Sequence, residues 1–130
     1  MEARIGRTTP EARRQARFAG RRAELLAAVY LRLKGYRILA RRYSVRGGEI
    51  DLIARHGTAI VFIEVKYRPT LAEAMAAIDA WKSRRVSRAA RVWLAANPWA
   101  VRLTLRGDAV YLAPRRWPRH IKAAMPLDFD

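Results

Sequence analysis

Two apolar segments of the sequence each carry charged residues that could do chemistry. The segment GEIDLIA contains Glu49 and Asp51, and the segment VFIEVKYR, a little further on, contains Glu64 and Lys66. Acids are scarce in this chain, which has 27 Lys and Arg residues and 11 Asp and Glu residues. Carboxylates placed among Ile, Val and Leu therefore need an explanation beyond surface solubility.

A β-hairpin would bring these charged side chains together. The apolar runs and the short, glycine-containing connection between them favour such a hairpin. If Arg55 faces Ile60, antiparallel pairing also places Asp51 opposite Glu64, because each pair of residue numbers has the same sum. A register slipped by two residues would pair Glu49 with Glu64 and keep the same side chains on one face.

Alternation along the two strands gives the hairpin one mixed face and one apolar face. The mixed face is expected to hold Glu49, Asp51, Ile53, Phe62, Glu64 and Lys66. The apolar face is expected to hold Ile50, Leu52, Ala54, Val61, Ile63 and Val65. We expect the wholly apolar face to lie in the core.

The mixed face has the chemistry of a metal site for phosphodiester hydrolysis. Residues directly opposite each other have Cβ atoms roughly 5 Å apart, so Asp51 and Glu64 would repel and one carboxyl pKa would rise unless a cation intervenes. Hard oxygen ligands without His or Cys select Mg²⁺ or Mn²⁺. Lys66 can orient a water for attack while the metal stabilises charge on the phosphorus oxygens. The open alternative is a surface ion pair between Glu64 and Lys66, with Asp51 solvated.

The composition narrows the function further. Cysteine is absent, which excludes thiol catalysis and Cys-ligated zinc. Only two histidines occur, which argues against a His-rich metal site. The formal charge of +16, carried mainly by arginine, favours a polyanionic partner, and nucleic acid is the leading one. A solvated, arginine-rich surface is the alternative. No segment has the length and apolarity of a signal peptide or a membrane span, so we expect a cytoplasmic protein without a membrane partner.

A chain of 130 residues fits one domain, with Met1–Arg7 as a loose tail. A helix is expected to begin at Thr8-Thr9-Pro10 and to stop at Gly35. Its apolar stripe at helical spacing, expected to face the core, consists of Leu25, Leu26, Val29, Tyr30 and Leu33.

The remaining segments complete an α/β domain with one mixed sheet of about five strands flanked by helices. We expect strands at Tyr36–Ser44, Glu49–Arg55 and Ala59–Tyr67, a helical region at Leu71–Ala96 with a phase shift near Ser83, and a second hairpin at Val101–Ala113 that turns at Gly107-Asp108. The tail beyond is expected to form a short helix, and core positions are expected for Trp81, Trp93 and Trp99.

The succession of GEIDLIA and VFIEVKYR closely resembles UPF0102, also called the YraN family, a family of small bacterial proteins. That family is similar to the restriction-endonuclease-like superfamily with the PD-(D/E)xK signature and to archaeal Holliday-junction resolvases. The resemblance covers most of the chain and includes Gly20–Leu31, Gly35-Tyr36, Lys82, Arg106–Leu112 and Trp117–Ala124. Ile50 stands where the superfamily has proline. Gly107 stands where family members have phenylalanine, which leaves the role of Asp108 open.

The resemblance assigns roles to individual residues. It implies that Asp51 and Glu64 are metal ligands, that Lys66 is the catalytic lysine, and that Glu24 is a third acid on the first helix. From the sequence alone, Glu24 could equally pair with a nearby arginine on that helix. The small residues on its face would let the helix approach the sheet and direct Glu24 toward the metal. Resolvase-like enzymes cut two strands, so the resemblance is also compatible with a homodimer.

Basic residues at helical spacing are candidates for contacts with phosphates. On the first helix these include Arg17 and Arg21, and on the later helix they are Lys82, Arg84, Arg88 and Arg91. A solvated helix face is the alternative for each row. Arginines around Trp117 could add stacking on an unpaired base.

Two functions follow as hypotheses. The first is a Mg²⁺-dependent DNA endonuclease, a hydrolase that is either structure-selective, as resolvases are, or nonspecific. The second is a non-catalytic nucleic-acid-binding accessory protein in recombination or repair, which keeps the fold without turnover.

Overall fold

The computed structural model describes residues 9–129, with the main chain alone at residues 16 and 18. The tail predicted at residues 1–7 lies outside the described residues. In chain order the elements are α1 (Pro10–Leu33), β1 (Arg37–Val45), β2 (Gly48–His56), β3 (Ala59–Tyr67), α2 (Leu71–Met75), α3 (Ala80–Ala96), the 3₁₀ helix η1 (Pro98–Arg102), β4 (Thr104–Leu112) and β5 (Arg119–Met125).

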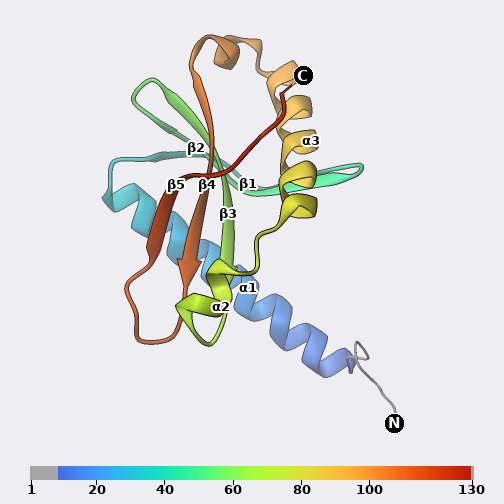
Figure 1. Ribbon diagram of the computed structural model, residues 1–130, viewed down its shortest axis with the longest axis vertical. Helices are drawn as coiled ribbons and strands as arrows, with labels where there is room; N and C mark the ends of the chain where they lie inside the picture. Colours follow the sequence, from blue (N-terminus) through green and yellow to red (C-terminus); the bar gives the residue numbers. More distant parts are fainter. Residues whose placement is uncertain (1–8, 130) are drawn as a thin grey trace.

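The five strands form one mixed sheet in the order β1-β2-β3-β4-β5. The pair β3 and β4 is parallel, and the other neighbouring pairs are antiparallel. Between β3 and β4 the chain passes through α2 and α3, which gives it the length that a parallel connection needs. α1 packs on one face of the sheet and α3 on the other (Figure 1). The predicted α/β class with a five-stranded mixed sheet is confirmed.

The ends of α1 follow the local signals in the sequence. The Thr9 side chain accepts a hydrogen bond of 3.0 Å from the Ala12 N–H and so caps the first turn, where Pro10 has no N–H to satisfy. The helix ends at Leu33, and Gly35 follows with a φ of +91°, a conformation that glycine adopts without strain. The predicted start and stop are confirmed.

The predicted core stripe of α1 is wrong. Leu25, Leu26, Val29 and Leu33 are exposed, and Tyr30 is half-buried. The helix instead turns small residues to the sheet: among its described side chains, the buried ones are Ala23, Ala27 and Ala28, together with Leu31. Alanine lets a helix axis come close to a sheet whose own side chains are Val, Leu and Ile. Helical spacing alone could not distinguish this alanine face from the adjacent face, which carries the larger apolar side chains.

The predicted second hairpin is also wrong. Gly107 and Asp108 lie in the middle of one continuous strand, β4, and do not form a turn. A Cβ at Gly107 would lie 2.8 Å from the Leu127 side chain and 3.0 Å from the Met125 carbonyl oxygen. Glycine is therefore used here for a close approach of the C-terminal segment, and the space beside it is taken by Leu127.

Three smaller expectations differ from the structure. The C-terminal tail forms strand β5 rather than a short helix, because it pairs with β4. The helical region breaks between Met75 and Ala80, whereas Ser83 is buried inside α3. Trp93 is in the core as predicted, but Trp81 and Trp99 are 56% and 48% exposed.

None of the helices within residues 9–129 combines the length and apolarity required to cross a bilayer.

Candidate functional site

The charged hairpin has the predicted register. Arg55 pairs with Ile60, and the β2–β3 ladder runs from His56–Ala59 to Leu52–Ile63. The same register would set Asp51 opposite Glu64, one position beyond the end of this ladder. There the Asp51 carboxylate accepts a hydrogen bond of 2.7 Å from the Val65 N–H. The Asp51 side chain therefore bridges β2 and β3 at the point where their pairing ends.

Both faces of this hairpin are covered, which corrects the prediction of a single core face. Ile53 and Phe62, on the predicted mixed face, pack against α3. Ile50 belongs to this α3 cluster rather than to the α1 cluster. The reason lies at Gly48, where the backbone of α3 approaches so closely that a Cβ would collide with the Arg85 carbonyl oxygen. The start of β2 is thus held under α3.

Glu64 is the centre of the site, and its side chain is almost completely buried. Its Oε2 lies 3.1 Å from the Nζ of Lys66 and 3.1 Å from the Nζ of Lys82. Its Oε1 is buried without any hydrogen-bond partner. An unpartnered carboxylate oxygen away from water is costly. This oxygen is therefore the place in the site where a further donor or a cation would be most stabilising.

Lys82 reaches the site from α3, on a different element from Lys66. Its backbone N–H is bound by the Asp79 side chain, which caps α3 and fixes the first turn. Burial by itself would lower the pKa of Lys82, but the Glu64 carboxylate raises it above its usual value. Two ammonium groups thus meet at one buried carboxylate.

Asp51 lies beside two other acids, Glu64 and Glu24. Burial, followed by the nearby Glu64 charge, raises the pKa of Asp51 to about 8, against the opposing hydrogen bond from Val65. Glu24 of α1 hydrogen-bonds to Asp51, and its pKa is raised, mainly by burial, although Arg42 lies 3.4 Å away. We call Glu24, Asp51 and Glu64 the carboxylate cluster.

The carboxylate cluster has the donors for a divalent cation but is not closed around one. Among the side chains of His, Asp and Glu in the described part of the chain, no three are already arranged as ligands of one ion. Glu64 faces its two lysines and Glu24 faces Arg42. The oxygen-only donor set, the unpartnered Glu64 oxygen and the raised pKa of Asp51 all suit a hard cation such as Mg²⁺ or Mn²⁺.

Glu49 lies at the margin of this site. It pairs with Ser44 of β1, and its carboxylate is 3.9 Å from the Arg85 guanidinium. Its side chain is 46% exposed, so water screens its charge. Glu49 therefore contributes negative potential to the site more than it contributes a ligand.

The basic residues predicted to contact nucleic acid lie in separate surroundings. Arg17 and Arg21 are exposed on α1, and Arg84 is exposed on α3. Arg88 donates a hydrogen bond of 2.7 Å to the Arg46 carbonyl in the β1–β2 turn. Their contact with nucleic acid stays a prediction.

The other two basic residues of α3 have different partners again. Lys82 turns to the carboxylate cluster, and Arg91 donates a hydrogen bond of 2.6 Å to the Asp128 carbonyl. The row on α3 is therefore divided between the carboxylate cluster, the β1–β2 turn and the C-terminal segment.

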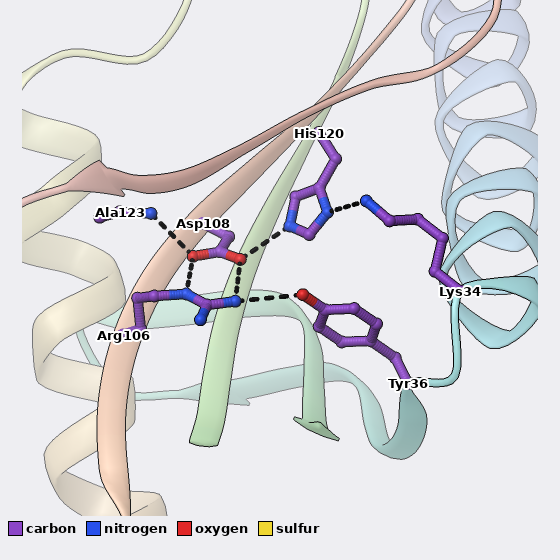
Figure 2. A network of polar contacts seen from close by, with 6 residues as sticks. All are labelled: Lys34, Tyr36, Arg106, Asp108, His120 and Ala123. Carbon is purple, nitrogen blue, oxygen red and sulfur yellow. Dashed lines mark hydrogen bonds and ion pairs between the residues drawn. The ribbon is translucent and has the colours of Figure 1, made fainter. Parts of the chain in front are cut away.

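A second polar cluster surrounds Asp108, whose role the sequence left open. Figure 2 shows its carboxylate between two cationic or polar side chains and one main-chain N–H. Arg106 donates two hydrogen bonds of 2.7 and 2.8 Å, His120 lies 2.7 Å away, and the Ala123 N–H donates at 2.9 Å. Burial by itself would raise the pKa of Asp108, but the bonds from His120, Arg106 and Ala123 lower it to about 2.

The Asp108 network extends to the loop after α1. Lys34 Nζ donates to His120 Nδ1 at 2.7 Å, so the other ring nitrogen carries the proton that faces Asp108. Arg106 also donates to the Tyr36 hydroxyl at 3.1 Å. The network joins β4 and β5 to the loop between α1 and β1. The pattern Arg-x-Asp with a distant His was its only signal in the sequence.

The fold and the site define a class of protein: an α/β domain with a buried cluster of carboxylates and lysines on the inner strands β2 and β3 of a mixed sheet, beside α1 and α3. The chain belongs to the uncharacterised protein family UPF0102, whose model matches residues 23–112. The predicted resemblance to this family is confirmed. The matched residues include the carboxylate cluster, Lys66, Lys82 and Asp108, whereas His120 lies beyond them.

Individual relatives are similar to this chain in amino-acid sequence over nearly its whole length. A UPF0102 protein of Methylobacterium nodulans is 59% identical over 116 residues, which are 89% of this chain and 90% of the relative. One from Methylocella silvestris is 57% identical over 117 residues, covering 90% and 94% of the two chains. One from Bartonella henselae is 47% identical over 120 residues, covering 92% and 95%.

Proposed function

We propose that this protein is a metal-dependent endonuclease that hydrolyses phosphodiester bonds in nucleic acid, with DNA as the expected substrate. The observation that carries the proposal is Glu64, a buried carboxylate with one unpartnered oxygen, set between two lysines and beside Asp51. Both lysines contact the same oxygen, Oε2, which leaves Oε1 as the atom of Glu64 that could bind a cation.

Asp51 and Glu64 would hold Mg²⁺ or Mn²⁺, with Glu24 as the third acid. When bound, the ion would stabilise negative charge on the oxygens of the scissile phosphate. The raised pKa of Asp51 supports this assignment, because burial and the neighbouring Glu64 charge disfavour the ionised carboxylate, and a bound cation would favour it.

The lysines would act on the phosphate and on the attacking water. Lys66 is held 3.1 Å from Glu64, within reach of a water beside the same carboxylate, and would orient that water for attack. Lys82, at the same distance on the α3 side, would contact a phosphate oxygen once Glu64 engages a metal ion. The exposed arginines and the formal charge of +16 would raise the local concentration of the polyanion.

Calorimetric titration of Mg²⁺ and Mn²⁺, run beside a cleavage assay, tests the proposal. The substrates are single-stranded, flapped, four-way and linear DNA. We expect the wild type to bind metal and cleave at least one substrate, and Asp51→Ala to lose both while DNA binding is kept or strengthened. Glu11→Ala, at an exposed acid in the first turn of α1, is the matched control. Undiminished cleavage by Asp51→Ala would overturn the assignment of the site.

One observation favours a second candidate, a non-catalytic nucleic-acid-binding accessory protein. Lys66 and Lys82 each lie 3.1 Å from Glu64, and two such lysines can balance the charge of this carboxylate without a metal. This candidate predicts that the affinity for nucleic acid changes neither when Mg²⁺ is added nor when Asp51 is substituted. Single-turnover cleavage of any substrate in the panel would rule it out.

A further inference from the structure

The outer face of α1 carries a row of large apolar side chains that nothing in the described chain covers. Leu26, Val29 and Leu33 are 56%, 51% and 82% exposed. They recur every three or four residues, which is the spacing of a ridge that packs against another helix. Scattered single apolar residues are common on protein surfaces, but a continuous row on one helix marks an interaction surface.

This row forms one wall of a groove of about 540 Å³. The opposite wall is the loop after β4, which contributes Pro114 and Trp117, and Leu112 also lines the space. Trp117 is 85% exposed, so most of its indole is offered to a partner. Because the surface is concave and largely aliphatic, it suits an inserted row of apolar side chains better than a flat membrane surface.

The charged residues that line the groove are all basic. Arg22, Arg115 and Arg116 line it, and no Asp or Glu does so among the residues that the structure describes. A partner that fills the groove must therefore be apolar where it meets the Leu and Val side chains and acidic where it meets the guanidinium groups. An amphipathic helix with acidic flanks has both properties.

Other occupants match the groove less well. A second copy of the chain would bring another formal charge of +16 to a basic rim. A nucleic-acid strand would satisfy the arginines and could stack on Trp117, but its bases carry polar edges that Leu26, Val29 and Leu33 cannot hydrogen-bond.

We propose that the groove between α1 and the loop after β4 binds an amphipathic helix of a partner protein, with its apolar side against α1 and its Asp and Glu residues against Arg115 and Arg116. The binding is helix-in-groove recognition with electrostatic complementarity at the rim. The proposal is independent of the nuclease reaction, because the groove does not include any residue of the carboxylate cluster.

A displayed library of helical peptides tests it directly. The peptides are about 18 residues long, beyond the length at which isolated helices are marginal, and have Leu fixed at helical spacing. Their remaining positions vary among Glu, Lys, Gln and Ala. We expect selection on the full chain to enrich Glu beside the Leu row, and the selected peptides to bind in solution.

Variants at exposed positions connect the selected peptides to the groove. Two variants, Trp117→Ala and the double change Arg115→Glu with Arg116→Glu, should each lower the affinity for the selected peptides at least tenfold, which is about 1.4 kcal/mol of binding free energy. The loss in the charge-reversal variant should shrink at high salt. Val101→Ala, at a position 56% exposed on η1, is the matched control and should bind as the wild type does. Circular dichroism confirms that each variant is folded.

Three results would overturn the proposal. The first is a selection that enriches Lys, or that yields no peptide sensitive to Trp117→Ala. The second is a dimer of the wild type in sedimentation that Leu26→Glu dissociates, which would assign the groove to a second copy. The third is a selection that yields no peptide, together with single-stranded DNA binding that Trp117→Ala abolishes. This result would assign the groove to nucleic acid.

Discussion

Asp108 in β4 and Asp51 in β2 are both acids within the same sheet, but their surroundings differ in almost every respect. Asp108 accepts hydrogen bonds from Arg106, His120 and a main-chain N–H, and its pKa is about 2. Asp51 accepts one main-chain hydrogen bond and faces other carboxylates, and its pKa is about 8. Hydrogen bonds favour the charged form of the first acid, whereas burial and the neighbouring Glu64 disfavour the charged form of the second.

The difference separates a structural acid from an acid available for chemistry. The bonds of Asp108 join β4 to β5, so its charge stabilises the fold. Burial and the Glu64 charge raise the pKa of Asp51, so ionising this carboxyl costs stability unless a cation binds, and the unpartnered Oε1 of Glu64 would gain from the same cation. Burial alone therefore does not identify a functional acid, because the balance of partners around the carboxylate decides its role.

The largest expected effect comes from removing the satisfied acid. Asp108→Ala leaves Arg106 and His120 without their buried partner, so we expect a loss of about 3–5 kcal/mol in the free energy of unfolding. Urea denaturation followed by circular dichroism measures it. Glu11→Ala, at an exposed acid, should change stability little. A loss below about 1 kcal/mol in Asp108→Ala would contradict the structural role.

The two acids should also respond to pH in opposite directions, and Asp108 gives the effect at acid pH. Its pKa falls from 3.8 to about 2 on folding, so its contribution is present above pH 3.8 and is lost as the pH falls to about 2. The contribution is about 2 kcal/mol. Acid unfolding of Asp108→Asn should lack this loss between pH 4 and pH 2, and a slope equal to that of the wild type would be inconsistent with the prediction.

Metal binding would sharpen the comparison, because it should act through Asp51 and not through Asp108. At a tenfold excess of Mg²⁺ over its Kd, the wild type should gain about 1.4 kcal/mol of stability. Thermal unfolding with and without Mg²⁺ measures the gain as a rise in Tm. Asp51→Ala should show no rise, and an equal rise in both proteins would place the ion elsewhere.

The most conservative change is the isosteric Asp51→Asn in metal-free buffer. The pKa of Asp51 is raised on folding, so the wild type loses stability as the pH rises from about 4 toward 8. The variant should not have this loss and should be more stable than the wild type at pH 9 by at least about 1 kcal/mol. If the two proteins instead show the same dependence of stability on pH, the raised pKa of Asp51 is contradicted.

Local signals in the sequence predicted several elements well. Thr9 and Pro10 set the start of α1 and Gly35 its end, because caps and positive φ depend on a few neighbouring residues. The register of the β2–β3 hairpin followed from its short connection. The same signals failed where a distant segment intervened: Gly107 resembles a turn residue but serves the approach of Leu127.

The α1 face shows the limit of periodicity most clearly. Leu26 and Leu33 have helical spacing, and so do Ala23 and Ala27 on the neighbouring stripe. Only the packing of α1 on a sheet of bulky side chains selected the alanine stripe and left the leucines outside.

The sequence by itself determined the family, the α/β class and the presence of Asp51, Glu64 and Lys66 on two paired strands. These properties follow from residue identity and from alternation over short distances. Only the tertiary structure decided that Lys82 of α3 shares an oxygen of Glu64 and that His120 of β5 meets Asp108. Such contacts join segments far apart in the chain, and their geometry depends on how helices and strands pack together.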